Sequence, residues 1–252
     1  MANESTRNLS VEHDGEALAI ASLIGAATIW GTATIGTKTA LESIPPFLLT
    51  ELRWILAFSA LFSMVWLRGK RPLLNRHTFI LAVLGIATFN FFFNFGLQRT
   101  SAANGSLISG ALPVVIAILS FFLLNERLPP IAWVGVCLSI VGIAVTLSGR
   151  TLDTSPLGNG LMIGSVFVWA GYSIYSRLHV RGEDAMTVTA GTAVFGLLLL
   201  IPLSLWEVVN DPLPDPTWKL TGIVLFLGLG PSLMGILFWS FGLTRVPASR
   251  AG

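Results

Sequence analysis

The chain has 252 residues, of which 53% are hydrophobic and 11% are charged, and its formal net charge is +2. About a quarter of the residues in a soluble domain are charged, so the composition excludes an ordinary soluble protein. The small net charge gives no indication of a nucleic-acid partner. The apolar residues lie in long runs between short polar segments, which predicts an integral membrane protein embedded in a lipid bilayer.

In chain order, a polar segment over residues 1–16 comes first and is expected to form a short cytoplasmic tail. Eight apolar runs follow, each close to the ~20 residues that a helix needs to cross a bilayer. The predicted spans are 17–37, 46–67, 78–98, 101–124, 130–148, 157–178, 186–206 and 220–243. These runs are too long for strands, and lipid offers no water to backbone amides, so we expect an all-α, polytopic protein.

The basic residues predict which side of the membrane the N-terminus occupies. If the N-terminus is cytoplasmic, ten Lys and Arg residues fall on the inner side and four on the outer side. The inner residues are Arg7, Arg68, Lys70, Arg71, Arg76, Arg127, Arg177, Arg181, Arg245 and Arg250, and the outer ones are Lys38, Arg99, Arg150 and Lys219. This bias favours a cytoplasmic N-terminus by the positive-inside rule.

Part of the sequence occurs twice. Residues 21–38 match residues 160–177 at an offset of 139, and residues 92–102 match residues 238–248 at an offset of 146. The matched pairs include Gly25 and Gly164, Trp30 and Trp169, Lys38 and Arg177, Phe92 and Phe238, Gly96 and Gly242, and Leu97 and Leu243. The copy of the first helix lies in the sixth span, with four spans between them, so the copies cross the membrane in opposite directions. Inverted repeats of this kind are typical of secondary transporters.

Several short motifs occur in a fixed order along the chain. They are Trp30-Gly31, Arg53, Gly96-Leu97 before Ala102-Ala103, Pro113, the segment 124–128, and Gly135 with Gly142. Together they resemble the EamA group of the drug/metabolite transporter superfamily. The resemblance implies two five-helix repeats, here over 17–148 and 157–252. The second repeat then holds only the sixth to eighth helices, so we expect a truncated form of a ten-helix parent.

Two charged residues fall inside a predicted span, where charge is costly. Glu51 and Arg53 lie in the second span, two positions apart and therefore on different faces of the helix. One interpretation places Arg53 in an internal cavity, where it binds an anionic group or a carbonyl, and makes Glu51 a proton-exchanging carboxylate. The alternative is that both side chains extend to the outer surface of the membrane.

A polar stripe follows the third span. Asn90, Asn94 and Gln98 are four residues apart, so their side chains share one face of the helix. These amides could line a solute path, or they could form hydrogen bonds that hold neighbouring helices together.

Trp30 and Trp169 occupy matching positions in the two repeats. Polar residues lie close to each of them in sequence: Thr34 in the first repeat, and Tyr172 and Ser173 in the second. These residues could form a stacking wall for a planar solute. The alternative is a structural role in packing one repeat against the other.

Proline and glycine interrupt two of the spans. Pro113 lacks an amide hydrogen, so it leaves the carbonyl one turn earlier, at Ser109, without its helical partner. Gly228, Gly230 and Pro231 interrupt the last span similarly. Such openings expose polar backbone at the binding sites of transporters, although a static kink is the alternative.

These features favour a secondary-active transporter that exports or exchanges small organic metabolites by alternating access in the bacterial inner (plasma) membrane. The chain has no Walker A pattern and no cluster of metal ligands, so neither ATP nor another cofactor is expected. A non-transporting membrane subunit or an inactive fragment is the alternative, and a membrane-embedded enzyme ranks third. The expected partners are lipid and a small solute, with a monomer and a homodimer both left open.

Overall fold

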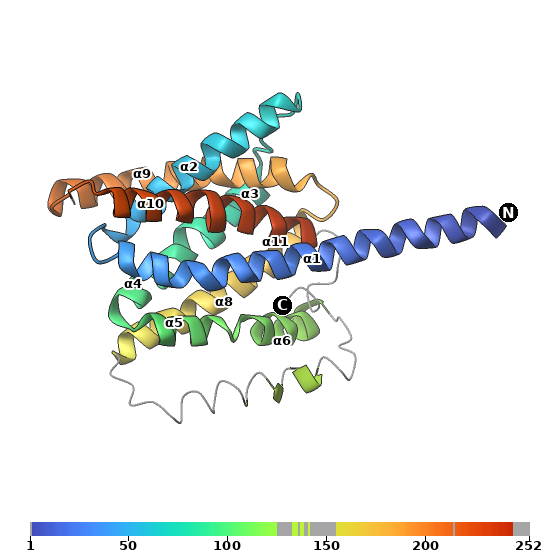
Figure 1. The fold of residues 1–252 in the computed structure, drawn as a ribbon, viewed down its shortest axis with the longest axis horizontal. Helices are drawn as coiled ribbons and strands as arrows, with labels where there is room; N and C mark the ends of the chain where they lie inside the picture. The colour runs from blue at the N-terminus through green and yellow to red at the C-terminus, as the bar shows by residue number, and fades with distance from the viewer. Residues whose placement is uncertain are drawn as a thin grey trace.

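The computed structural model describes residues 2–124, 133–135, 137–138, 141, 155–213 and 215–243. Over these residues it contains helices and no strand, as predicted, and most of the predicted span 130–148 lies outside them. The elements are α1 (Ala2–Ala40), α2 (Pro46–Leu67), α3 (Arg76–Ala82), η1 (Val83–Thr88), α4 (Phe89–Arg99), α5 (Ala102–Ser109), α6 (Leu112–Leu124), α8 (Pro156–His179), α9 (Ala185–Asn210), α10 (Trp218–Leu227), η2 (Gly228–Gly235) and α11 (Ile236–Leu243). α1 extends beyond its predicted span and projects from the bundle (Figure 1).

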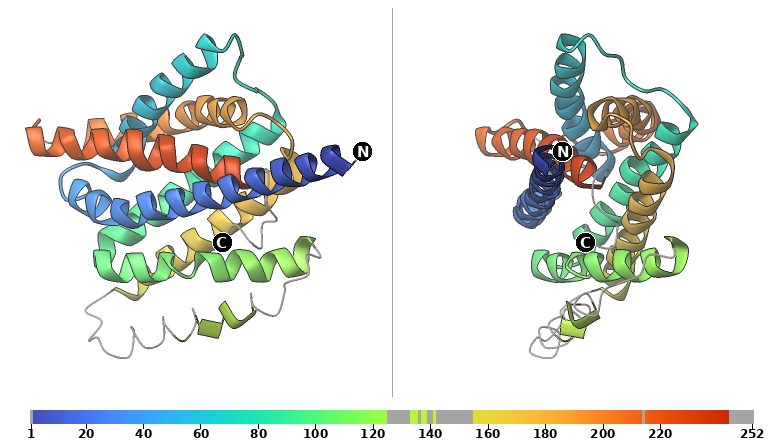
Figure 2. Two further views of the ribbon diagram at one scale, coloured as in Figure 1. Left: turned by 45° about the vertical axis from the view of Figure 1, so that its right-hand side comes forward. Right: turned by 90° about the vertical axis from the view of Figure 1, so that its right-hand side faces the viewer.

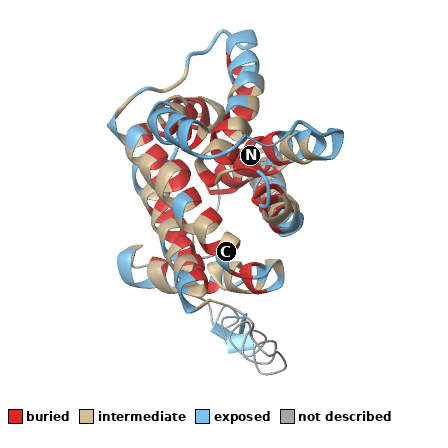
Figure 3. Cartoon of the chain, turned by 90° about the vertical axis from the view of Figure 1, so that its left-hand side faces the viewer, coloured by how far each residue is buried: buried red, intermediate tan, exposed pale blue. Residues whose placement is uncertain are grey.

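Seven segments of the described chain are long and apolar enough to cross a membrane, and they correspond to seven of the eight predicted spans. Buried residues gather where helices face one another, while the outer faces of the bundle are exposed (Figure 3). Large apolar side chains occur on these outer faces. Trp66, Trp206 and Trp218 lie near helix ends and are 68%, 62% and 93% exposed, as expected for tryptophans at a membrane interface.

Side-chain caps determine where several helices begin. At the start of α3, the side chain of Asn75 accepts hydrogen bonds from two backbone amides, each at 2.9 Å. Ser155, Asp184 and Thr217 accept similar bonds at the starts of α8, α9 and α10. α2 differs, because the residue before it is Pro45, which supplies no side-chain cap. The first amides of α2 therefore need a partner from another part of the chain.

Equivalent helices of the two repeats pack in the same way, and α2 of the first repeat packs against α9 of the second. α8 packs against α3, η1 and α4, and α1 packs correspondingly against α10, η2 and α11 (Figures 1 and 2). α2 and α9 contact each other and run antiparallel. Leu48, near the start of α2, bonds to Glu207 near the end of α9, and Lys70, just after α2, pairs with Asp184, just before α9. We call the end of the bundle with the Leu48–Glu207 contact the α1–α2 end, and the end with the Lys70–Asp184 contact the α2–α3 end.

Matched residues make matched contacts in the two repeats. Lys38 Nζ donates to the backbone oxygen of Leu97 at 2.7 Å, and Arg177 Nη1 donates to the backbone oxygen of Leu243 at 2.9 Å. Each basic side chain thus binds carbonyls at the C-terminal end of a neighbouring helix, where the helix dipole favours a cation. Because α1 and α8 end at opposite ends of the bundle, the two bonds also lie at opposite ends. The repeats are therefore inverted.

Two of the spans contain a π-helical stretch at equivalent positions. An offset of 146 carries η1 onto residues 229–234, which lie within η2. A third span is interrupted between α5 and α6, where Gly110 and Ala111 form a turn just before Pro113. Proline has no amide hydrogen to continue the helix, which accounts for the break. Interruptions of this kind concentrate at functional sites, and all three lie around one cavity.

Candidate solute-binding site

A cavity of about 440 Å³ lies between the repeats, and residues from α1, α2, η1, α4, α5, α6, α8, η2 and α11 line it. This volume is within the ~300–1,000 Å³ range of sites for small molecules. Most of the lining is apolar. Its polar side chains are Thr34, Thr37, Arg53, Asn90, Ser106, Ser109, Ser165 and Ser232.

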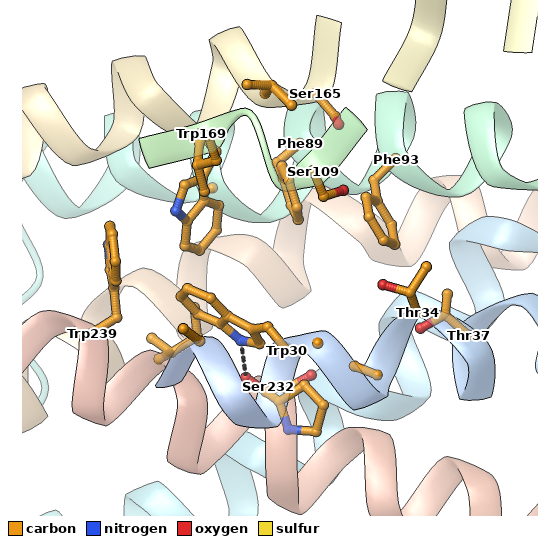
Figure 4. Close-up of a pocket in the computed structure, with 18 of the residues that line it drawn as sticks. Trp30, Thr34, Thr37, Phe89, Phe93, Ser109, Ser165, Trp169, Ser232 and Trp239 are labelled. Carbon is orange, nitrogen blue, oxygen red and sulfur yellow. Dashed lines mark hydrogen bonds between the residues drawn. The ribbon is translucent and has the colours of Figure 1, made fainter. Parts of the chain in front are cut away.

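Aromatic rings form one wall of the cavity (Figure 4). Trp30 and Trp169, the matched pair, meet edge to face with ring centroids 5.1 Å apart. Trp239 lies 5.4 Å from Trp30, and Phe89 lies 4.7 Å from Trp169. Such a wall suits a planar solute, because the ring faces offer both apolar area and stacking geometry.

The two central tryptophans differ in their polar contacts. Trp30 Nε1 donates to the backbone oxygen of Pro231 in η2 at 3.1 Å. The indole nitrogen of Trp169 is buried and has no hydrogen-bond partner within the described chain. The first ring is therefore fixed to the π-helical stretch, whereas the second is held by packing alone.

Among the described residues that line the cavity, Arg53 is the one with a charged side chain. Its Nε donates to Ser232 Oγ at 3.1 Å, which joins α2 to η2 across the repeat boundary. Thr34 and Thr37 lie at one side of the cavity, away from Trp239 (Figure 4). Their hydroxyls form no hydrogen bond with described residues and are available to a solute.

Six of the predicted site residues line the cavity. They are Trp30, Thr34, Arg53, Asn90, Pro113 and Trp169. Pro113 contributes together with Ser109 and Gly110, so the break between α5 and α6 faces the cavity. The structure thus assembles residues from both repeats that are far apart in sequence.

The predicted polar stripe does not line one continuous path. Asn90 reaches the cavity, whereas Asn94 is fully buried and donates to Thr50 Oγ1 at 2.8 Å and to the backbone oxygen of Pro46 at 3.2 Å. Asn94 therefore joins the third span to α2, which is the structural alternative for this stripe. Gln98 is half-buried outside the lining, near the end of α4.

Tyr172 and Ser173 lie behind the aromatic wall and outside the lining. The ring of Tyr172 stacks on Trp169 with centroids 4.8 Å apart and also covers Gly85, where a Cβ would lie 2.7 Å from it. Ser173 Oγ donates to the backbone oxygen of Trp169 at 2.9 Å. Both residues support Trp169 from behind, so their contact with a solute is not direct.

Two acidic side chains are buried inside the bundle. Glu51 is 7% exposed, lies outside the cavity lining, and its Oε2 has no hydrogen-bond partner in the described chain. Glu207 is 2% exposed and its Oε2 accepts from the backbone amide of Leu48 at 2.7 Å. From the sequence, Glu51 is the one acid expected inside a span, because Glu207 falls just beyond the predicted span 186–206. The structure corrects this by burying both.

Sequence reasoning also missed Phe93, Trp239 and Ser232. The offset of 146 pairs Phe93 with Trp239, and both line the cavity. The repeat alignment therefore contained the signal for these two. Ser232 has no such signal, since its counterpart is the apolar Ile86. Within the described residues, no cluster of three His, Cys, Asp or Glu side chains could hold a metal ion.

Inverted helical repeats around a cavity of interrupted helices define the class of membrane transporters. The sequence profile of the EamA-like transporter family matches residues 17–148 and 156–252, so the chain belongs to this family. This membership and the names of its relatives indicate a transporter rather than an enzyme.

Two relatives and one solved structure give the degree of similarity. The chain is 29% identical over 244 residues to the uncharacterized transporter YetK of Bacillus subtilis (strain 168), covering 93% of this chain and 74% of YetK. It is 27% identical over 235 residues to the aromatic amino acid exporter YddG of Ancylobacter novellus, covering 89% and 80%. A crystal structure at 24% identity superposes with a TM-score of 0.74, covering 92% of this chain and 82% of that one, and shows a shared fold.

Proposed function

We propose that this protein is a secondary-active transporter that exports or exchanges small organic solutes by alternating access. The observation that carries the proposal is the cavity between the inverted repeats, with Trp30 and Trp169 meeting inside it. A site shared by two inverted halves can open to either side when the halves rock against each other.

The contacts between α2 and α9 supply a closure at each end of the bundle. At the α1–α2 end, Glu207 binds the first turn of α2. At the α2–α3 end, Lys70 pairs with Asp184, and the amide of Leu73 donates to the backbone oxygen of Thr187 at 2.9 Å. Rocking would release one set of contacts while the other set holds. The excess of basic residues on one side supports a cytoplasmic N-terminus in a bacterial plasma membrane.

The solute we propose is small and contains a planar ring. Four tryptophans and two phenylalanines line the cavity, and ring stacking holds flat solutes without demanding a specific hydrogen-bond pattern. The name of the relative YddG, an aromatic amino acid exporter, supports a solute of this kind.

Flux into liposomes tests this function. The purified chain is reconstituted and the uptake of radiolabelled tryptophan, phenylalanine, adenine and benzoate is measured against protein-free vesicles. We expect at least one of them to move, and we expect Trp30→Ala to slow its uptake about tenfold or more by removing part of the ring wall. Trp66→Ala, which changes an exposed tryptophan outside the cavity, is the control.

Two results would contradict the proposal. Absence of flux for every solute would favour a non-transporting membrane subunit. Equal uptake by wild type and Trp30→Ala would show that solute passes elsewhere than through this cavity.

A further inference from the structure

We propose that the cavity selects an organic anion, whose carboxylate binds the guanidinium of Arg53 beside Ser232 while its planar ring lies against Trp30. This inference rests on the proposed function and specifies its substrate class. A net anion is preferred over a zwitterion or a cation of the same shape.

The position of Arg53 is the first support. It is the eighth residue of α2, about 10 Å along the helix from its start. Its side chain lines the cavity, and its Nε lies 3.1 Å from Ser232 Oγ on the facing π-helical stretch. The side chain is therefore directed to the interior of the protein, and it does not extend to the outer surface of the membrane.

The second support is that this guanidinium has no counter-ion among the residues that the structure describes. No carboxylate of a described residue lies within 4.0 Å of it, and its two terminal nitrogens make no hydrogen bond within the described chain. Glu51 is two positions away, about 200° around the helix, and it does not line the cavity. A charge inside a bilayer is stable only when it is paired or hydrogen-bonded. The N–H groups of a planar guanidinium can donate two parallel hydrogen bonds to the two oxygens of a carboxylate.

The third support comes from the repeat. An offset of 139 aligns the starts of α2 and α9 and places Thr192 at the position of Arg53, and the offset of 146 places Ile86 at the position of Ser232. Both Thr192 and Ile86 are buried. The scaffold therefore buries two uncharged residues at the equivalent positions, so helix packing does not require a guanidinium there.

The lining also disfavours a cation. Its described residues include no aspartate or glutamate, so among them the ammonium group of an amino acid can contact hydroxyls, an amide and ring faces but no carboxylate. Specificity is a difference between affinities, and a site with one fixed positive charge raises the affinity for a net anion while it lowers that for a cation.

One short segment can bind both parts of the solute. Pro231 holds Trp30 through its backbone oxygen, and the next residue, Ser232, holds Arg53. Consecutive Cα atoms are only about 3.8 Å apart. Trp30 and Arg53 are thus held by adjacent residues, at a separation that the ring and the carboxylate of one small aromatic solute can span.

Binding of matched probes to the reconstituted full chain tests this inference. The probes are indole-3-propionate, tryptophan and tryptamine, which share an indole and a short side chain but carry a net negative, zero and net positive charge. Affinity is measured by calorimetry and by the ligand-induced rise in unfolding temperature. We expect indole-3-propionate to bind wild type about tenfold or more tightly than either of the others.

Variants at Arg53 assign the preference to this residue. Arg53→Gln is expected to abolish it, and Arg53→Lys to retain part of it, because lysine keeps the charge but loses the two-point geometry. Arg68→Gln removes an exposed charge outside the cavity and serves as the control. If Arg53→Gln does not fold, the wild-type order of affinities still decides the question.

The outcomes separate this inference from the proposed function. Tryptophan or tryptamine binding as tightly as indole-3-propionate, or an unchanged preference in Arg53→Gln, would overturn the anion inference while transport through the cavity could stand. Absence of flux for every solute overturns the proposed function itself.

Discussion

The carboxylate of Glu207 in α9 accepts a hydrogen bond from the backbone amide of Leu48 in α2 at 2.7 Å. Leu48 lies in the first turn of α2, where backbone amides have no partner within the helix. Pro45 supplies no side-chain cap there, so Glu207 performs this role from the other repeat. The contact both completes α2 and holds the two repeats together at the α1–α2 end.

Replacement of Glu207 tests this capping role. We expect Glu207→Ala to lower the free energy of unfolding by about 1–2 kcal/mol, the usual effect of losing a helix cap. Glu207→Gln keeps an acceptor and should lose less. Thermal unfolding followed by tryptophan fluorescence measures both, with the exposed Glu183→Ala as the control. The same unfolding midpoint for Glu207→Ala and Glu183→Ala would contradict the role.

Glycines between paired helices test the close packing of the third and sixth spans. A Cβ at Gly96 would lie 2.9 Å from the backbone nitrogen of Met162, whereas Gly160 has no atom within 4 Å of an added Cβ. Backbone cannot move aside as a flexible side chain can, so we expect Gly96→Ala to destabilise the protein by about 1–3 kcal/mol.

Gly160, in α8, provides the control for this prediction. Gly160→Ala should leave stability unchanged or raise it slightly, because alanine favours the helix. Comparison of the two unfolding temperatures checks the prediction, and equal destabilisation by both variants would show that the Gly96 contact is not tight.

The ion pair between Lys70 and Asp184 predicts a pH dependence. The hydrogen bond from Lys70 is the largest factor that lowers the pKa of Asp184, and backbone amides of Thr187 and Met186 lower it further. A carboxyl with a lowered pKa in the folded state stabilises the protein above its ordinary pKa. That stabilisation is lost as the pH falls from near 3.8, the ordinary pKa of the carboxyl, through its lower pKa in the folded protein.

Unfolding temperature measured against pH checks this direction. Because the pair is partly exposed, its effect should be only about 0.2–1 kcal/mol. Asp184→Asn keeps the helix cap but removes the charge, so its unfolding temperature should fall less steeply in acid than that of wild type. An equally steep fall in both proteins would show that other groups dominate.

Two buried acids make proton coupling testable. If Glu51 exchanges protons during transport, Glu51→Gln should abolish the dependence of flux on a pH gradient while exchange of solute for solute continues. Glu207→Gln is the matched variant, since Glu207 is also buried but is engaged with α2. Flux in liposomes with and without a pH gradient measures both, and undiminished coupling in Glu51→Gln excludes this role for Glu51.

The repeat pattern predicted more of the structure than the individual residue types did. It matched Lys38 with Arg177 and Leu97 with Leu243, and the structure joins each basic residue to the corresponding carbonyl. It also pairs Phe93 with Trp239, and both residues line the cavity. A repeat preserves contacts because both copies must pack against equivalent neighbours.

The sequence by itself determined the membrane class, seven of the spans that the structure describes, and the inverted repeat, because these depend on apolar length and internal similarity. Only the tertiary structure decided which polar residues reach the cavity. Asn90 and Asn94 share one stripe, yet Asn90 lines the cavity and Asn94 bonds to Thr50. Helical periodicity fixes which side chains share a face, but what that face meets changes along its length with the neighbouring helices. For the same reason, the bonds that join Arg53 to Ser232 and Glu207 to Leu48 could not be predicted from the sequence and are seen only in the tertiary structure.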